Sequence, residues 1–352
     1  MPLMIRQAAE TQTLYAELAE RLRALEAARS FASLAGSFAK KQVRDGDYWY
    51  FKTSEGAAGQ KEYFIGPDDR ETKAVMKAYA AGRPEAEASL AQIDRLCAML
   101  RQGGAMLTDT PSARVIAGLA SAGVFRVGAV LVGTHAYIAL GNLLGVRWES
   151  ALRTQDIDLA ATSVLQVAVP QTEADLPKAL DALNMGFLPV PGLNPKEPET
   201  AFKVRGQALR VDLLTPAKGA RSGKPIAIPR LKGAAQPLEM LDYLLEAPVP
   251  VPLINGGATL VNVPDPARFA LHKLIISGRR QVFEQAKAGK DRQQAGEIIA
   301  ALYEDRRGDL GLAVEALNNR AAAWRTRLRR ELVKLPHDLN AARALILRGL
   351  DA

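Results

Sequence analysis

The sequence predicts an α+β protein in which helices occupy both ends of the chain and short strands are concentrated in the middle. Apolar residues recur at helical spacing near both ends. Between them, short apolar or alternating runs bounded by Gly and Pro are typical of strands. We therefore expect an N-terminal helical region with an aromatic β-hairpin (1–104), a central domain rich in strands (112–263) and a basic helical domain (264–352).

The composition favours a protein with a sizeable core and no covalent cross-links. The chain has 352 residues, of which 48% are hydrophobic. Its single cysteine, Cys97, excludes an internal disulfide and a Cys-rich zinc site, and apolar neighbours predict a buried thiol. No signal-peptide core and no apolar segment of roughly 20 residues is present, so we expect a cytoplasmic protein with no membrane partner.

The net charge permits an anionic partner. The formal charge is +8, and residues 265–352 contribute most of it, with 17 Lys and Arg against 11 Asp and Glu. The basic run at 324–331 is interpreted either as a contact with nucleic-acid phosphates or as a solvated helix with internal ion pairs.

The N-terminal region combines helices with aromatic runs. Residues 11–39 read as an amphipathic helix, and residues 70–104 as two helices separated at Gly82-Arg83-Pro84. Between them, residues 47–52 and 61–67 are aromatic runs that predict a β-hairpin. Its rings either pack against the first helix or, with the neighbouring lysines, stack on nucleic-acid bases.

A strand followed by a Gly-Thr turn has the pattern of a phosphate site. Residues 125–132 predict a buried strand that ends at Gly133-Thr134, where a helix begins. Gly133 lets the backbone approach a phosphate, Thr134 offers a hydroxyl, and the helix N-terminus presents unpaired N–H groups. His135 is interpreted either as a nucleotide contact or as a structural capping residue.

Three aspartates follow on two predicted strands. In Asp156-Ile157-Asp158, the period of two places both carboxylates on one face and Ile157 on the other. Asp212 lies in a second predicted strand, 208–214, with apolar neighbours. Adjacent strands would bring the three carboxylates together, and such a group of hard oxygen ligands suits Mg²⁺ or Mn²⁺.

The order of these motifs resembles the DNA polymerase β-type nucleotidyltransferase superfamily. The resemblance is carried by Gly133-Thr134, Thr154-x-Asp156-Ile157-Asp158 and Val211-Asp212-Leu213. The string from Arg153 to Asp158 is similar to bacterial members associated with abortive-infection and toxin systems. The resemblance implies a mixed sheet with packed helices and a helical domain that closes over the nucleotide.

The resemblance also implies roles for particular residues. Asp156, Asp158 and Asp212 would be catalytic metal ligands, and Asp212 would help deprotonate the acceptor hydroxyl. The family usually has Ser where this chain has Thr134, which keeps the hydroxyl. Nucleotide and phosphate binding is assigned to Gly133, Thr134, Arg153, Lys273 and Arg280.

Lys273 and Arg280 are seven residues apart on one face of a predicted helix. Related enzymes often place a lysine there against the triphosphate, followed by a step similar to Lys290-Asp291. A solvated helix face is the alternative interpretation for these basic residues, and His272 is predicted to be packed or at the surface rather than a ligand.

The sequence therefore predicts an enzyme that uses an NTP and Mg²⁺ or Mn²⁺ to transfer a nucleotidyl group to a hydroxyl of RNA, tRNA or protein, releasing pyrophosphate. A toxin acting on tRNA is a subclass of this prediction. The alternative is a non-catalytic nucleotide or nucleic-acid binding module with the same fold, against which three intact aspartates argue. The sequence contains no Walker loop, Gly-x-Ser-x-Gly elbow, zinc-ligand spacing or dinucleotide fingerprint.

Overall fold

The structure is a computed structural model that describes residues 4–27, 36–43, 46–53, 62–148, 155–162, 174–192, 194, 196–217, 223–280 and 284–351. Two residues of the sequence motifs, Arg153 and Thr154, lie outside these ranges, as does the Gly-rich turn of the predicted hairpin.

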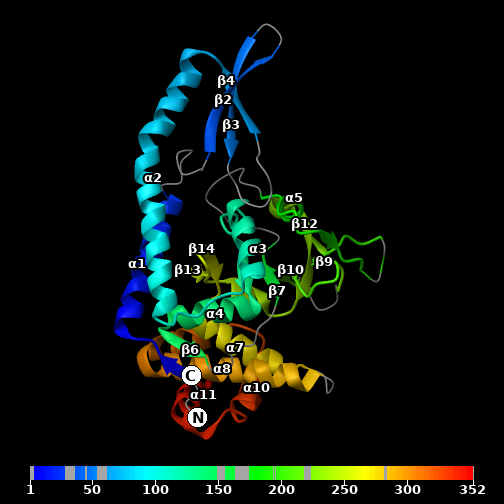
Figure 1. Cartoon of the computed structure of the whole chain (residues 1–352). Helices are drawn as coiled ribbons and strands as arrows, with labels where there is room; N and C mark the ends of the chain where they lie inside the picture. The colour runs from blue at the N-terminus through cyan, green and yellow to red at the C-terminus, as the bar shows by residue number, and fades with distance from the viewer. Residues whose placement is uncertain are drawn as a thin grey trace.

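Seven strands of the described residues form a mixed sheet at the centre of the molecule (Figure 1). They are β5 (Val130–Val132), β7 (Asp156–Ala160), β8 (Phe187–Pro189), β9 (Ala201–Val204), β10 (Arg210–Pro216), β11 (Ile226–Ile228) and β12 (Gly233–Leu238). The main order is β11-β12-β10-β7-β5, while β9 joins β10 and β8 joins β9. Strand β10 is parallel to β7 and β12, whereas β5 is antiparallel to β7 and β9 to β10.

Alternating side chains explain why β7 and β10 lie inside this sheet. Ile157 and Leu159 of β7, with Val211 and Leu213 of β10, are fully buried. The residues between them point to the opposite face, as expected from the two-residue period of a strand. The predicted strands at 156–160 and 208–214 and the hairpin between β9 and β10 are confirmed. The predicted surface loop at 217–237 is wrong in part, because β11 and β12 form there.

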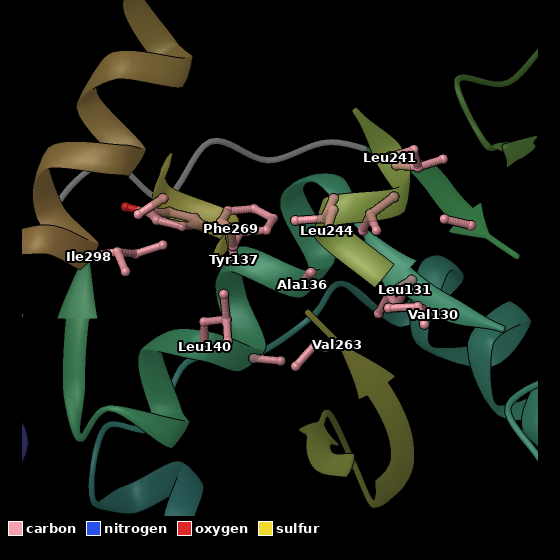
Figure 2. Packing of buried hydrophobic residues seen from close by; sticks show 14 of the residues in the cluster. Val130, Leu131, Ala136, Tyr137, Leu140, Leu241, Leu244, Val263, Phe269 and Ile298 are labelled. Atoms are coloured by element: carbon pink, nitrogen blue, oxygen red, sulfur yellow. The ribbon is translucent and has the colours of Figure 1, made fainter. Parts of the chain in front are cut away.

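Helices cover the sheet and continue its core into the C-terminal region. The helices of the central region are α3 (Thr110–Ser121), α4 (Gly133–Leu143), α5 (Leu176–Ala182) and α6 (Leu241–Leu245). Figure 2 shows Leu131 of β5, Tyr137 of α4 and Phe269 of a C-terminal helix among the buried side chains of one cluster. The central and C-terminal regions therefore share a hydrophobic core.

The described residues from 266 onward are mainly helical, as predicted. The described helices are α7 (Pro266–Ser277), α8 (Gln285–Asp305), α9 (Arg307–Asn318), α10 (Ala322–Leu332) and α11 (Asn340–Asp351), and the short 3-10 helices are η2 (Pro229–Leu231) and η4 (His337–Leu339). In the basic run, Arg325 donates to the carbonyl of Asn318 and Arg329 to Asp351. These contacts support the interpretation of this run as internally paired.

Two small antiparallel pairs connect the N-terminal region to the rest. Strand β1 (Met4–Arg6) pairs with β6 (Val146–Trp148), and β13 (Val249–Ile254) pairs with β14 (Ala258–Val263). Helix α1 (Ala9–Ala27) and the C-terminal part of α2 (Arg70–Gln102) pack together beside β13 through Leu18, Leu100 and Ile254. Cys97 is fully buried in this cluster, as predicted.

The aromatic segment forms a sheet at the far end of α2 (Figure 1). Its strands are β2 (Gly36–Val43), β3 (Gly46–Thr53) and β4 (Glu62–Pro67). Phe38 and Phe51 pack edge-on against Tyr79 of α2. The hairpin is confirmed with an additional strand, β2, which replaces the end of the predicted first helix, and its packing partner is α2 rather than α1.

Helix α2 is continuous through Pro84, so the predicted break at this position is wrong. Proline removes one helical hydrogen bond. The helix is held on both sides of this point, by Tyr79 on the aromatic sheet and by Leu96 on α1. Among the helices that the structure describes, none has the length and apolar content that a membrane crossing requires.

Candidate functional site

The register of β7 and β10 brings the three predicted aspartates to one face of the central sheet. Asp158 lies opposite Asp212, and Asp156 lies opposite Arg210. Paired residues on neighbouring strands point to the same face, and their strands are about 4.8 Å apart. The four side chains therefore form a two-by-two array of three carboxylates and one guanidinium.

The Gly-Thr turn lies directly beside this array. Val132 is paired with Asp158 in the β5–β7 ladder, and Gly133 follows with φ of +69°. A Cβ atom at Gly133 would lie 2.1 Å from Oδ2 of Asp158. Glycine is therefore required here both by the left-handed backbone and by the close approach of the carboxylate.

The array disfavours additional negative charge. Burial, followed by the neighbouring carboxylates of Asp212 and Asp156, raises the pKa of Asp158 to about 6. The positive charges of Lys273 and Arg210 act in the opposite direction. A cation at this position would favour the ionised form of Asp158.

Arg210 neutralises part of the charge through a bidentate ion pair with Asp212. Its Nε donates to Oδ1 at 3.0 Å and to Oδ2 at 2.7 Å, and its Nη2 donates to Oδ1 at 2.6 Å. The hydrogen bonds to Asp212 raise the pKa of Arg210. Sequence analysis missed Arg210, although an Arg two residues before an Asp on one strand must share its face.

The donor chemistry of the array suits Mg²⁺ or Mn²⁺, but the present side-chain arrangement does not complete a site. Asp156, Asp158 and Asp212 supply hard oxygen ligands on adjacent strand positions. Across the residues that the structure describes, no three His, Cys, Asp or Glu side chains are arranged to hold a metal ion. Both oxygens of Asp212 are instead engaged by Arg210.

A lysine from the C-terminal region reaches the Gly133-Thr134 turn. Thr134 is buried at the start of α4, and Nζ of Lys290 donates to its Oγ1 at 3.2 Å. Burial, followed by the charge of Lys273, lowers the pKa of Lys290. The sequence motif includes Lys290, but sequence analysis did not assign this residue to the site.

The predicted pair Lys273 and Arg280 is held together by Asp291. Nζ of Lys273 donates to Oδ1 of Asp291 at 2.7 Å, and Nε of Arg280 donates to Oδ2 at 2.9 Å. Asp291 is 4% exposed, so the two cations share a buried carboxylate. The charge of Lys273 lowers the pKa of Asp158. Arg280 is linked to Lys273 through their shared partner, Asp291.

Both histidines noted in the sequence are buried. Neither ring nitrogen of His135 has a hydrogen-bond partner among the described residues, and burial lowers its pKa. Burial lowers the pKa of His272 to about 3, which agrees with its prediction as a packed residue. Burial therefore disfavours the charged form of both imidazoles.

An apolar cavity of about 640 Å³ lies on the other face of the sheet. It is lined by Phe187, Pro189 and Phe202 among others. Phe202 is paired with Val211 and so points away from the face of Asp212. The cavity is therefore not part of the acidic array.

Comparison with known proteins places the chain in a family. Residues 110–318 match a nucleotidyltransferase family, and because this span is more than half of the chain, the protein belongs to that family. The chain is also similar to the crystal structure of an antigenic nucleotidyltransferase-like protein from Paracoccidioides brasiliensis, with 19% identity and a TM-score of 0.41, covering 68% of this chain and 94% of that one. No curated protein matches the sequence.

Proposed function

We propose that this protein transfers a nucleoside monophosphate from an NTP, such as ATP, to a hydroxyl-bearing acceptor and releases pyrophosphate. The observation that carries the proposal is the register that places Asp158 opposite Asp212 and beside Gly133. Membership of the nucleotidyltransferase family supports the same reaction class.

The triphosphate would lie at the N-terminus of α4. Gly133 and Thr134 begin this helix, and its first N–H groups and positive dipole end suit an anion. Lys290 donates to Thr134, and Lys273 donates to Asp291, the residue that follows Lys290, so both ammonium groups lie near this position. We propose that they bind the β- and γ-phosphates.

Asp156, Asp158 and Asp212 would hold a divalent cation of the Mg²⁺ class. When bound, such a cation supplies charge neutralisation and polarisation of phosphate oxygens. The acceptor oxygen forms a new bond to the α-phosphorus, the bond between the α-phosphorus and the bridging oxygen breaks, and pyrophosphate leaves with that oxygen. Asp212 lies on the same face as Asp158. When it is released from Arg210, it takes up the proton of the acceptor hydroxyl.

The proposal is tested by incubating the full chain with labelled NTPs, Mg²⁺ or Mn²⁺ and acceptors that include RNA, tRNA and protein. Asp158→Asn and Asp212→Asn should each lower product formation by more than about 100-fold, because each removes charge needed in the transition state. Asp94→Asn, on the exposed side of α2, serves as the matched control and should retain activity. Labelling that survives in both array variants would contradict the proposed site.

The ion pair between Arg210 and Asp212 favours a second candidate function, a nucleotide-binding module without turnover. In that case the third carboxylate would remain engaged when nucleotide binds. Metal-dependent nucleotide binding by calorimetry, together with no product on the same acceptor panel, would support this alternative.

A further inference from the structure

Arg210 is bound to Asp212, the carboxylate that in the proposed reaction would hold a divalent metal ion. Two of its nitrogens make three hydrogen bonds to the two oxygens of Asp212, between 2.6 and 3.0 Å. This geometry resembles chelation, because the fork of a guanidinium matches the two oxygens of a carboxylate. Asp212 therefore has a positively charged partner, Arg210.

The contact is a property of strand β10 itself. Arg210 and Asp212 are two residues apart, so both point to the face that carries Asp156 and Asp158. Opposite Asp156, the guanidinium reduces the formal charge of the array from three negative charges to two. The charges of Asp156 and Asp158 also raise the pKa of Arg210, so its position is favourable to the array as a whole.

Arg210 can leave this position without unpacking the core. Its side chain is 40% exposed and that of Asp212 is 20% exposed. A long side chain at that exposure can exchange a protein contact for water by rotating about its own bonds. The buried residues of the strand, Val211 and Leu213, point to the other face and are unaffected.

We propose that Arg210 is a resident counter-cation that competes with a divalent cation for Asp212, so that metal binding requires release of the guanidinium. This inference rests on the proposed nucleotidyl transfer and adds a residue that controls metal loading. It accounts for the presence of three appropriate carboxylates on one face without a completed three-ligand arrangement among the described residues.

Replacing Arg210 should therefore strengthen metal binding. Arg210→Gln removes the competitor and leaves the array with a higher negative charge, and both effects favour a divalent cation. We expect Mn²⁺ to bind about tenfold more tightly, which corresponds to about 1.4 kcal/mol. Arg210→Lys keeps a charge but loses the bidentate fork, so its Mn²⁺ affinity should lie between those of wild type and Arg210→Gln.

The experiment is a calorimetric Mn²⁺ titration of the full chain at pH 8, without nucleotide, together with the shift in melting temperature that Mn²⁺ causes. It compares wild type with Arg210→Gln, Arg210→Lys and Asp212→Asn. Arg205→Gln, in the exposed turn before β10, removes the same charge outside the array and should bind Mn²⁺ as wild type does. If Arg210→Gln does not fold, Arg210→Lys provides the test.

Binding that is equal or weaker in the Arg210 variants than in wild type overturns the inference. If wild-type binding also depends on Asp158 and Asp212, the proposed metal site survives and only the role of Arg210 is lost. If Mn²⁺ binds to none of the proteins, or binds with no dependence on the aspartates, the metal site of the proposed function fails as well.

Discussion

Substitution of Gly133 by Ala tests the close contact between the turn and the acidic array. An Ala at φ of +69° has a left-handed backbone, which costs about 1–2 kcal/mol. Its Cβ would also lie 2.1 Å from Oδ2 of Asp158, so the carboxylate must move, and overpacking of this kind costs about 1–3 kcal/mol. Gly133→Ala should therefore lower the free energy of unfolding by about 2–5 kcal/mol.

Two comparisons separate these contributions in urea unfolding experiments. Gly206 has φ of +75°, and a methyl group added there would have no atom within 4 Å, so Gly206→Ala reports the backbone contribution alone, about 1–2 kcal/mol. In an Asp158→Ala background, the effect of Gly133→Ala should fall to the same value, because the obstructing carboxylate is absent. Equal destabilisation by Gly133→Ala and Gly206→Ala in the wild-type background would refute the contact.

Two further predictions concern buried carboxylates. Asp291→Asn should lower stability by about 3–5 kcal/mol in thermal unfolding and weaken NTP binding, because Lys273 and Arg280 lose a shared buried partner; unchanged NTP affinity would show that Asp291 does not position these cations. Burial raises the pKa of Glu297 from 4.5 to about 8, so the folded protein binds the extra proton and wild-type stability should fall as pH rises from about 4.5 to 8. Glu297→Gln should flatten this dependence while the exposed Glu315→Gln should not, and an unchanged pH profile in Glu297→Gln would contradict the shift.

Elements with a clear period were predicted from sequence, and those set by tertiary contacts were not. The alternation in Asp156-Ile157-Asp158 predicts a strand with both aspartates on one face, because Ile157 is buried on the other. Strand β2 has no comparable apolar alternation and is defined by pairing with β3, so sequence assigned part of it to a helix. The helix break predicted at Pro84 was wrong because tertiary contacts on both sides of this residue stabilise the continuous helix.

The composition of the site was partly predictable, but its charge balance was not. Strand spacing indicated that Asp156, Asp158 and Asp212 could converge, and the register shows that they share a face. The bond from Arg210 to Asp212 depends on the rotamers of both side chains, and the bond from Lys290 to Thr134 joins residues 156 positions apart. The spacing of Arg210 and Asp212 indicates a shared face but not the bond between them, and no local pattern links Lys290 to Thr134.

Helix α2 joins the aromatic sheet to the cluster that it forms with α1 and β13. Its 33 residues correspond to a length of about 50 Å, so a tilt of about 10° at one end moves the other by about 9 Å. One end packs on α1 next to β13, which also contacts α4, the helix that begins at Gly133. A spectroscopic label on the aromatic sheet would therefore detect a tilt of α2 of this size as a displacement of the sheet.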